Sequence, residues 1–329
     1  MRAYVINEFG DPDVFKEADL PDPVPGDGEV LIDVKASSVN PVDYKIRDGR
    51  APFLSPPFPA VLHPDCAGVV RAIGTGVQGF VVGDPVYAFA SGIGAKQGAL
   101  ADLMVADARM VAKMPSTLSM EEAAALPLVT VTAWYCLVDK AAVGPGTSVF
   151  IEGGTGGVGH VAIQIAKSRG AQVFAACGTD QKCQIAEDLG AERAFNYREM
   201  TAEEMVAASP EGRGFDVVFN TPGAPSIDHA VSIAAFGGTI LDILGDFPVK
   251  PGFQMKWLSF VSVFAGRSIL MGVDQDGVGA ILRTAAELAE KGDLRPLLDP
   301  QRFSFADVGK AHAHAEHNQP TGKVVLSNL

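Results

Sequence analysis

The second half of the chain alternates short apolar runs with longer amphipathic stretches. Apolar runs of strand length cover residues 148–151, 172–176, 193–196, 216–219, 239–244 and 268–271. Stretches with helical spacing lie between them, at residues 158–168, 182–189, 202–208, 225–232 and 258–264. Alternation of this kind indicates a parallel sheet covered by helices. Six strands are the number expected of a complete doubly wound sheet, so the predicted class is α/β.

The first third of the chain has a different pattern. Residues 29–35, 67–73 and 84–89 have strand-like composition, and turn-forming clusters rich in Gly and Pro separate them. This pattern predicts a twisted, mostly antiparallel β domain. Ser119 and Glu122 have capping-box spacing and open a predicted helix, which places a domain boundary there. The expected domains are 1–122 (β-rich), 123–272 (parallel sheet) and 273–329, a return segment whose last strand, 321–326, rejoins the first domain.

A glycine-rich turn follows the first strand of the parallel sheet. Gly154, Gly156 and Gly159 stand at G-x-G-x-x-G spacing between strand 148–151 and helix 158–168. In a dinucleotide fold the first glycine allows a tight turn, the second lets the backbone approach a pyrophosphate, and the third lets helix and strand pack closely. The helix N-terminus then offers N–H groups to the anion. We therefore predict dinucleotide contacts from this turn, at Gly154, Thr155, Gly156, Gly157 and Val158; the alternative is an ordinary glycine loop.

The residues after the second strand indicate which nicotinamide cofactor binds. Many NAD-binding proteins place an acidic residue there, but this chain has Cys177 and Gly178. Thr179 and Lys182 follow, and both could hold a 2′-phosphate. Tyr197, after the third strand, could add a hydroxyl group. The pattern favours NADPH; the alternative is that Asp180 holds the ribose of NAD.

Composition excludes several classes of partner. Lys and Arg number 26 and Asp and Glu 39, which gives a formal net charge of −13. Such a balance disfavours nucleic acid and anionic membrane surfaces. The four cysteines show no zinc-ribbon or disulfide spacing, which is typical of reduced thiols in a cytoplasmic protein. The first residues form no signal peptide, and the longest apolar run, 123–138, is shorter than a membrane span and is expected to be a core helix.

Together, several motifs make the chain resemble the zinc-free quinone oxidoreductase branch of the medium-chain dehydrogenase/reductase superfamily. The motifs extend over nearly the whole chain, at residues 25–32, 38–43, 65–70, 83–86, 126–134, 152–159 and 321–325. The resemblance implies a GroES-like catalytic domain, a Rossmann domain, NADPH, and a homodimer joined edge to edge through the Rossmann sheets. It also implies cofactor contacts from Thr130, Gly178, Lys182, Tyr197, Asn220, Leu244, Gly245 and Asn318.

The zinc-dependent alcohol dehydrogenases are the nearest alternative within that superfamily. Their catalytic metal needs a cysteine and a Gly-His-Glu segment. This chain has Ser37-Ser38-Val39-Asn40 and His63-Pro64-Asp65 instead, so no thiolate is present and the imidazole is one residue out of register. No metal site is therefore expected. His63, where a small residue is usual, is expected to be a hydrogen-bonded loop histidine or part of the pocket wall.

Three further histidines, His312, His314 and His317, raise the possibility of a metal site near the C-terminus. On a helix only His314 and His317 share a face. A solvated helix end is the expectation for this segment.

Without a metal, the protein needs mainly to align and desolvate a hydride donor and its acceptor. Asn40, Asp43 and Tyr44 are the polar catalytic candidates, and Tyr44 could donate a hydrogen bond or a proton. We expect an NADPH-dependent reductase of small quinones or α,β-unsaturated carbonyls. The alternatives are a non-enzymatic NADPH-binding protein, crystallin-like or sensing in role, and a zinc alcohol dehydrogenase with atypical ligands.

Overall fold

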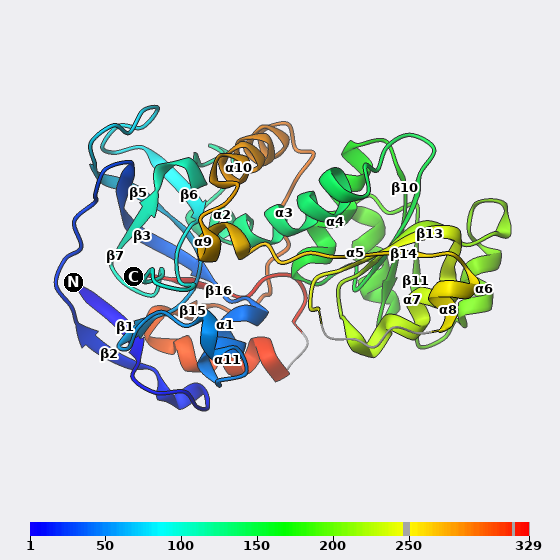
Figure 1. Cartoon of the computed structure of the whole chain (residues 1–329), viewed down its shortest axis with the longest axis horizontal. Helices are drawn as coiled ribbons and strands as arrows, with labels where there is room; N and C mark the ends of the chain where they lie inside the picture. The colour runs from blue at the N-terminus through cyan, green and yellow to red at the C-terminus, as the bar shows by residue number, and fades with distance from the viewer. Residues whose placement is uncertain (246–250, 318–319, 329) are drawn as a thin grey trace. The chain divides into compact units, whose positions relative to one another are not determined.

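The computed structural model describes residues 1–245, 251–317 and 320–328. Its internal contacts divide the chain into two compact units (Figure 1). Unit 1 comprises Met1–Leu128 and Gly266–Leu329, and unit 2 comprises Val129–Ala265. These limits lie close to the boundaries expected after residues 122 and 272, while the division into separately folding domains stays a prediction.

Unit 2 is built on a six-stranded parallel sheet, as the strand and helix alternation predicted. The strand order is β11-β10-β9-β12-β13-β14, the doubly wound arrangement. The strands are β9 (Ser148–Glu152), β10 (Gln172–Cys177), β11 (Arg193–Asn196), β12 (Phe215–Asn220), β13 (Ala234–Asp242) and β14 (Ser259–Ser262). The helices are α4 (Gly157–Ser168), α5 (Asp180–Asp188), α6 (Ala202–Ala207), α7 (Ile227–Ile233) and α8 (Pro251–Met255).

The core of unit 2 explains why its strands read as continuous apolar runs. Every residue of β9 is buried, because helices cover both faces of a parallel sheet. On one face, aromatic side chains from neighbouring strands pack together. The ring of Phe150 lies 4.7 Å from that of Phe215 and 5.9 Å from that of Phe195. The helices α6 and α7 contact each other and contribute Met205 and Ile227 to this core.

The sixth strand lies elsewhere than predicted. Residues 268–271, expected to be a strand, belong to helix α9 (Arg267–Met271), whereas 258–264, expected to be a helix, contains β14. Gly272 follows α9 in the left-handed conformation (φ 63°), as is common just after a helix. β14 is a four-residue strand at the edge of the sheet, and its two central residues are half-buried. Its sequence therefore lacks the alternation of apolar and polar residues that predicts a strand.

Unit 1 contains the β-rich domain predicted for the first third of the chain. A seven-stranded sheet has the order β15-β16-β3-β5-β6-β8, and β7 pairs with β3 outside this path. Its strands are β3 (Glu29–Ser38), β5 (Asp65–Ile73), β6 (Pro85–Phe89), β7 (Leu103–Asp107), β8 (Val111–Lys113), β15 (Phe303–Ser304) and β16 (Val325–Ser327). A smaller sheet holds β2 (Lys16–Asp19), β1 (Arg2–Ile6) and β4 (Ala60–Val61), in that order.

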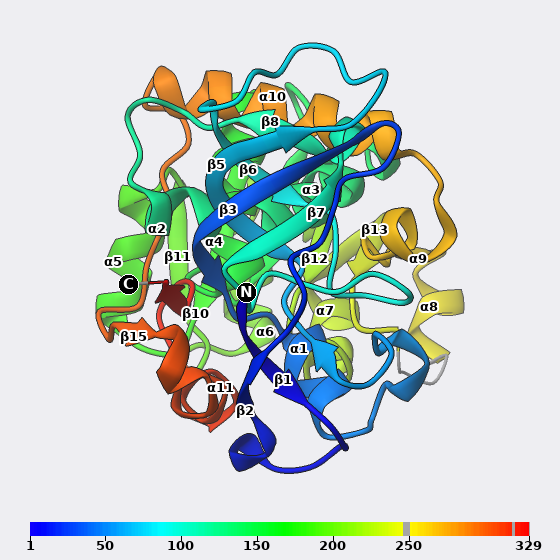
Figure 2. The same cartoon turned by 90° about the vertical axis from the view of Figure 1, so that its left-hand side faces the viewer.

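Helices close both ends of the apolar interior of unit 1. α10 (Gln275–Glu290) packs against β8 and β6 (Figure 2), and the hydroxyl of Tyr87 donates a hydrogen bond to the carbonyl oxygen of Leu282 within it. The other helices are α1 (Pro41–Arg47), α2 (Met120–Ala124), α9 and α11 (Val308–His317). α2 begins with the predicted capping box of Ser119 and Glu122. The long apolar run then forms α3 (Pro127–Trp134) and a π-helical segment (Tyr135–Lys140) rather than one helix.

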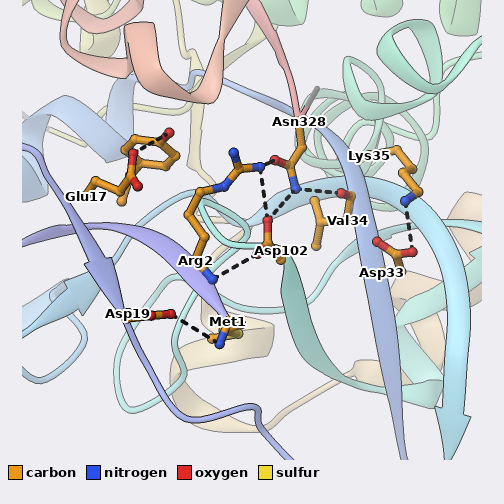
Figure 3. A network of polar contacts seen from close by, with 10 residues as sticks. Met1, Arg2, Glu17, Asp19, Asp33, Val34, Lys35, Asp102 and Asn328 are labelled. Carbon is orange, nitrogen blue, oxygen red and sulfur yellow. Dashed lines mark hydrogen bonds and ion pairs between the residues drawn. The ribbon is translucent and has the colours of Figure 1, made fainter.

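The last strand rejoins the first unit, as the sequence predicted, although it begins later, at Val325. β16 pairs antiparallel with β3. Asn328 extends this connection, because its side-chain amide donates to the carbonyl oxygen of Val34 at 3.0 Å and accepts from Arg2 at 2.6 Å (Figure 3). Arg2 also pairs with Asp102 at 3.2 Å. Arg2 and Asn328 are thus bonded to each other and to Asp102, which links the two sheets of unit 1.

Candidate functional site

The glycine turn lies between β9 and α4 as the motif predicted, but the residue that turns the chain is Gly153 rather than Gly154, the first glycine of the motif. β9 ends at Glu152, and Gly153 turns the chain with φ 69°. A Cβ on Gly154 would lie 2.8 Å from that of Ala175 on the next strand. A Cβ on Gly159 would lie only 2.1 Å from the carbonyl oxygen of Gly153, so α4 could not pack this closely on the turn with any side chain there.

The N-terminus of α4 carries no competing group. Gly156 is its N-cap and makes no side-chain hydrogen bond, and no acidic residue stands in the first turn. Helix N-termini need partners for their first N–H groups, and phosphate oxygens serve that purpose well. The turn from Gly154 to Val158 can therefore accept a pyrophosphate.

Four candidate residues for the 2′-phosphate lie together at the carboxyl ends of β10 and β11. Gly178 follows β10, and Thr179 caps α5 by accepting the N–H of Lys182 at 3.2 Å. The backbone N–H of Tyr197 donates to the carbonyl oxygen of Cys177 at 3.1 Å, which places its half-exposed ring beside Gly178. A side chain at position 178 would displace the ring of Tyr197 from this place.

Asp180, the residue that would favour NAD, is already engaged. Its carboxylate accepts a hydrogen bond of 2.9 Å from the side chain of Asn196. The pattern of contacts at this strand end therefore supports a phosphate-binding group around Thr179 and Lys182 more than a ribose-binding acid.

The side chain of Asn220 holds the loop after β12 in place by hydrogen bonds. Its side chain is fully buried at the end of β12, accepts from the N–H of Gly223 at 3.1 Å, and donates to Asp242 at 3.3 Å. Asp242 in turn accepts the N–H groups of Leu244 (3.1 Å) and Gly245 (2.7 Å). The side chain of Asn220 is thus used to shape two loops at the ligand-binding edge of the sheet.

Thr130 and Asn318 were also predicted to contact the cofactor. The side chain of Thr130 is buried in α3, and its hydroxyl oxygen has no hydrogen-bond partner among the described residues. A buried hydroxyl without a partner is costly, so a ligand atom could satisfy it. Asn318 lies outside the described residues.

In unit 1, Asn40 and Asp43 belong to a buried polar group that we call the Asp65 cluster: Ser38, Asn40, Asp43, Asp65 and Lys323. The carboxylate of Asp65 accepts from Ser38 (3.0 Å) and Asn40 (2.8 Å). Lys323 donates to the side-chain oxygen of Asn40 and lies 3.7 Å from Asp65. All five residues are at most 3% exposed.

The charges of the Asp65 cluster are unequally compensated. The other carboxylate oxygen of Asp65 accepts the backbone N–H of Leu128 at 2.8 Å, so Asp65 has four hydrogen-bonding or charged partners. Asp43 accepts only the backbone N–H of Asn40 at 2.7 Å, and its second oxygen has no partner among the described residues. Burial raises the pKa of Asp43 well above its usual value, and the charge of Asp65 adds to this effect. Burial also lowers the pKa of Lys323.

Tyr44 occupies a different environment from its neighbours in α1. Its ring is half-buried, and the Arg50 guanidinium lies 5.7 Å from the ring centre. Burial, together with the negative charge of Glu316, raises the pKa of Tyr44 to about 12. The phenol therefore stays protonated throughout the physiological range and can donate a hydrogen bond.

The expectation of a solvated helix end at the three C-terminal histidines was wrong for two of them. His312 is fully buried in α11 and contacts His63, while His314 hydrogen-bonds Asp299 at 3.0 Å. Only His317 is exposed. His63 is a hydrogen-bonded loop histidine, the first of its two expected roles. Within the described ranges, no three His, Cys, Asp or Glu residues are grouped so that they could hold a metal ion.

The sequence did not single out Asp65, Lys323 or Asp242 as site residues. Each is polar and stands directly before, within or after an apolar strand run, where a charged residue is unusual. A charged residue beside or within an apolar strand run was therefore the signal in the sequence that could have identified them. Their partners come from segments that are distant in sequence, so spacing alone could not reveal them.

Family models match both halves of the chain. The alcohol dehydrogenase GroES-like domain matches residues 26–116, and the zinc-binding dehydrogenase domain matches residues 157–257. Among helices in the part of the chain that the structure covers, none has both the length and the apolar character that crossing a bilayer requires.

Full-length relatives and solved structures agree with these matches. The chain is 34% identical to 2-methylene-furan-3-one reductase of Solanum lycopersicum and 33% identical to the chloroplastic NADPH-dependent alkenal/one oxidoreductase of Arabidopsis thaliana, covering 99% of this chain and 79% of each relative. It is 31% identical to human quinone oxidoreductase over 99% of this chain and 97% of the relative. An alcohol dehydrogenase superfamily structure from Novosphingobium aromaticivorans has a TM-score of 0.94 at 37% identity, covering all of both chains. The Escherichia coli quinone oxidoreductase complexed with NADPH has a TM-score of 0.87 at 26% identity, again over all of both chains.

Proposed function

Because this chain belongs to the quinone oxidoreductase branch of the medium-chain dehydrogenase/reductase superfamily, we propose that it is an NADPH-dependent reductase of quinones or α,β-unsaturated carbonyl compounds. The observation that carries the proposal is the glycine turn before α4, with its uncapped helix N-terminus, in a chain whose full-length relatives reduce such acceptors.

The residues of unit 2 fit NADPH. The turn from Gly154 to Val158 and the first turn of α4 would hold the pyrophosphate, since no side chain obstructs them. Gly178, Thr179, Lys182 and Tyr197 would hold the 2′-phosphate. NADPH supplies the hydride when bound. Thr130, Leu244 and Gly245 are proposed to contact its nicotinamide half. Asn220 is proposed to border the adenosine or ribose through the loops that its buried side chain shapes, and Asn318 is proposed to lie beside the cofactor.

In unit 1 we assign the substrate side to Asn40, Asp43 and Tyr44. The amide of Asn40 is occupied by Asp65 and Lys323, and its backbone N–H binds Asp43, so these two residues fix the start of α1. Tyr44 lies on the same helix, and its phenol is protonated. We therefore assign to Tyr44 the hydrogen bond that polarises a substrate carbonyl, and to Asn40 and Asp43 the positioning of the helix that carries it.

The proposal is tested by NADPH oxidation in stopped flow with a panel of quinones and enones. We expect turnover of members of one or both classes, and a much higher KM for NADH than for NADPH. NADPH binding without oxidation by any acceptor would instead support a non-enzymatic, crystallin-like or sensing role. Zinc bound stoichiometrically to the purified protein, and required for turnover, would support the alcohol dehydrogenase alternative.

We also propose that the protein is a homodimer joined through the free edge of β14. This strand pairs only with β13 among the described strands. Three exposed apolar side chains, Phe236, Met255 and Trp257, lie in or beside β13 and α8, and the rings of Phe236 and Trp257 are 4.9 Å apart. The N–H of Ser262 faces the free edge, because that of Val263 donates to Asp242 in the parallel ladder and alternate residues point the same way. A replacement of Ser262 by Pro should therefore give a monomer in analytical ultracentrifugation; an unchanged dimer would contradict the edge-to-edge arrangement.

A cytoplasmic location is the remaining part of the proposal. All four cysteines are free and buried, which supports a reducing compartment. Fractionation of cells that express the chain should recover it with cytoplasmic markers; recovery with membranes or organelles would contradict this location.

A further inference from the structure

Two histidines that lie far apart in the sequence meet in the interior of unit 1. His63 lies between β4 and β5, and His312 lies in α11; both side chains are fully buried. Their Nε2 atoms are 2.9 Å apart, and the rings are nearly parallel, with centres 5.1 Å apart. The proposed reaction makes no use of this pair.

The neighbours of the pair determine where each proton lies. The Ser37 hydroxyl donates its single proton to the carbonyl oxygen of Asp65 at 2.7 Å. It must therefore accept from Nδ1 of His63, at 3.0 Å. Nε2 of His63 is then unprotonated and accepts from Nε2 of His312. The remaining nitrogen of His312, Nδ1, is an acceptor that faces the guanidinium of Arg47 at 3.5 Å. Every contact has one donor and one acceptor only if both imidazoles are neutral.

Charged groups around the pair oppose its protonation. Arg47 of α1 is 2% exposed and acts on His312, and its own ion pair is with Glu316 of α11, at 2.9 Å. Lys323 acts on His63 from the C-terminal segment. Burial is the larger cause, and with Lys323 it lowers the pKa of His63 to about 3. Burial, His63 and Arg47 lower the pKa of His312 well below its usual value.

An added proton would place two donors against each other. On His63 it would oppose the N–H of His312, and on His312 it would oppose Arg47. The edge of Phe15 closes a further side of His312, with ring centres 4.8 Å apart, and offers no acceptor. A charged imidazole therefore cannot be accommodated without separating α11 from its neighbours.

The pair connects α11 to the segment that carries the Asp65 cluster. His63 adopts the left-handed conformation (φ 72°), which is uncommon for a residue other than Gly. Its carbonyl oxygen accepts the N–H of Ala99 at 2.9 Å. Two residues later, Asp65 begins β5 and binds Ser38 and Asn40. Separation of the histidines would remove the contact that holds this strained segment on α11.

We propose that His63 and His312 form an acid-sensitive latch, which holds α11 against the segment before β5 while both imidazoles are neutral and releases it when either is protonated. The latch goes beyond the reductase function and does not depend on it, because it concerns the folded state alone.

The sign of the pH dependence follows from the lowered pKa values. An unfolded histidine has a pKa of about 6.5, so below that pH the unfolded chain binds protons that the latch excludes. Stability is then lost as the pH falls below about 6.5. For each histidine, the ratio of unfolded to folded protein rises about tenfold between pH 7.5 and pH 5.5, and the pair gives about a hundredfold.

The first test is urea unfolding of the full chain at pH 7.5, 6.5 and 5.5. His312→Gln keeps both hydrogen bonds, with the amide N–H toward His63 and the oxygen toward Arg47, but cannot be protonated. Between pH 7.5 and pH 5.5, the rise in the ratio of unfolded to folded protein should be about ten times smaller for His312→Gln than for the wild type. For His63→Asn/His312→Gln it should be about a hundred times smaller. Asn is chosen because it tolerates the left-handed conformation. The control, His317→Gln on the exposed end of α11, should follow the wild type.

A second test needs no variant. In protein labelled with ¹⁵N-histidine, the ring nitrogen shifts at pH 6 should identify one neutral imidazole protonated at Nδ1 and one protonated at Nε2, both assigned to the buried pair. A charged imidazole at either position at pH 6, or equal pH dependence of stability in His312→Gln and the wild type, would overturn the latch.

Discussion

The phenolic oxygen of Tyr197 stands beside Gly178, where it occupies the space of a side chain: a Cβ added to Gly178 would lie 2.8 Å from it. A side chain at the end of β10 would therefore require the half-exposed ring of Tyr197 to move. This position is the one at which many NAD-binding proteins carry an acidic residue. The packing of Tyr197 thus opposes such an acid and supports the preference for NADPH.

Replacement of Gly178 by Asp should weaken NADPH binding. The new carboxylate would displace Tyr197 and repel the 2′-phosphate. A charge-assisted hydrogen bond contributes about 1.5–3 kcal/mol, so we expect Kd for NADPH to rise about 10- to 150-fold. Fluorescence titration measures the change, and Glu199→Gln, on the loop after β11 that carries Tyr197, is the control. An unchanged Kd would show that the 2′-phosphate binds elsewhere.

A substitution at Gly159 should disrupt the turn itself. In Gly159→Ala the Cβ would lie 2.1 Å from the Gly153 carbonyl oxygen, so the start of α4 must move. We expect a lower Tm and at least tenfold weaker NADPH binding, as α4 no longer presents its N–H groups correctly. In the control, Gly144→Ala, the new Cβ meets only the Arg169 carbonyl oxygen at 3.8 Å. Equal NADPH binding by the two variants would contradict the role of the turn.

Lys323 and Asp65 should be energetically coupled. Lys323→Met leaves the Asp65 carboxylate buried without its cation, and removal of one partner of a buried pair costs about 3–5 kcal/mol. Asp65→Asn/Lys323→Met removes both charges and should lose less than the sum of the two single variants. Urea unfolding of the four proteins forms the required double-mutant cycle. Strict additivity would mean that the 3.7 Å separation carries no interaction.

Asp43 should make the protein less stable as the pH rises. Its pKa is raised in the folded state, so the folded chain binds more protons than the unfolded chain above about pH 3.8. The stability that this proton provides is lost as the pH rises through the folded pKa. We expect Asp43→Asn, which keeps an acceptor for the Asn40 N–H, to be more stable than the wild type at pH 7 and less advantaged at pH 4. Parallel stability profiles of the two proteins from pH 4 to 7 would refute this.

Tyr44→Phe should lower the activity toward enones more than the activity toward quinones. A quinone accepts hydride readily, whereas an enone needs its carbonyl polarised, so we expect kcat/KM to fall at least tenfold for enones and little for quinones. Because the pKa of Tyr44 is about 12, the wild-type enone activity should not decline from ionisation of this phenol below pH 10. An equal loss for both classes would assign Tyr44 to packing rather than to the carbonyl.

Features encoded in short stretches of chain could be predicted from the sequence. The glycine turn, the alternation of strands with helices and the Ser119 capping box each depend on residues that are neighbours in sequence. The edge of the sheet could not be predicted so well. β14 is short and half-buried, and α9 has an equally apolar sequence, so periodicity did not distinguish them.

The buried polar groups were beyond sequence reasoning for a different reason. His312 was expected to lie on a solvated helix end, but it is buried against His63, a partner 249 residues away in the sequence. Asp65 and Lys323 likewise meet only when β16 returns to β3. Whether such a group is buried depends on the tertiary fold rather than on the residues next to it.

The pairing of β16 with β3 also has a consequence for synthesis on the ribosome. Unit 2 is one uninterrupted segment, Val129–Ala265, and the last of its six strands, β14, is synthesised more than sixty residues before β16 begins. Unit 1 receives β16, a neighbour of β3, and Lys323, the cation beside Asp65, only after unit 2 has been synthesised. During synthesis, the N-terminal part of unit 1 therefore has no β16 beside β3 and no Lys323 beside Asp65, while unit 2 is already able to fold.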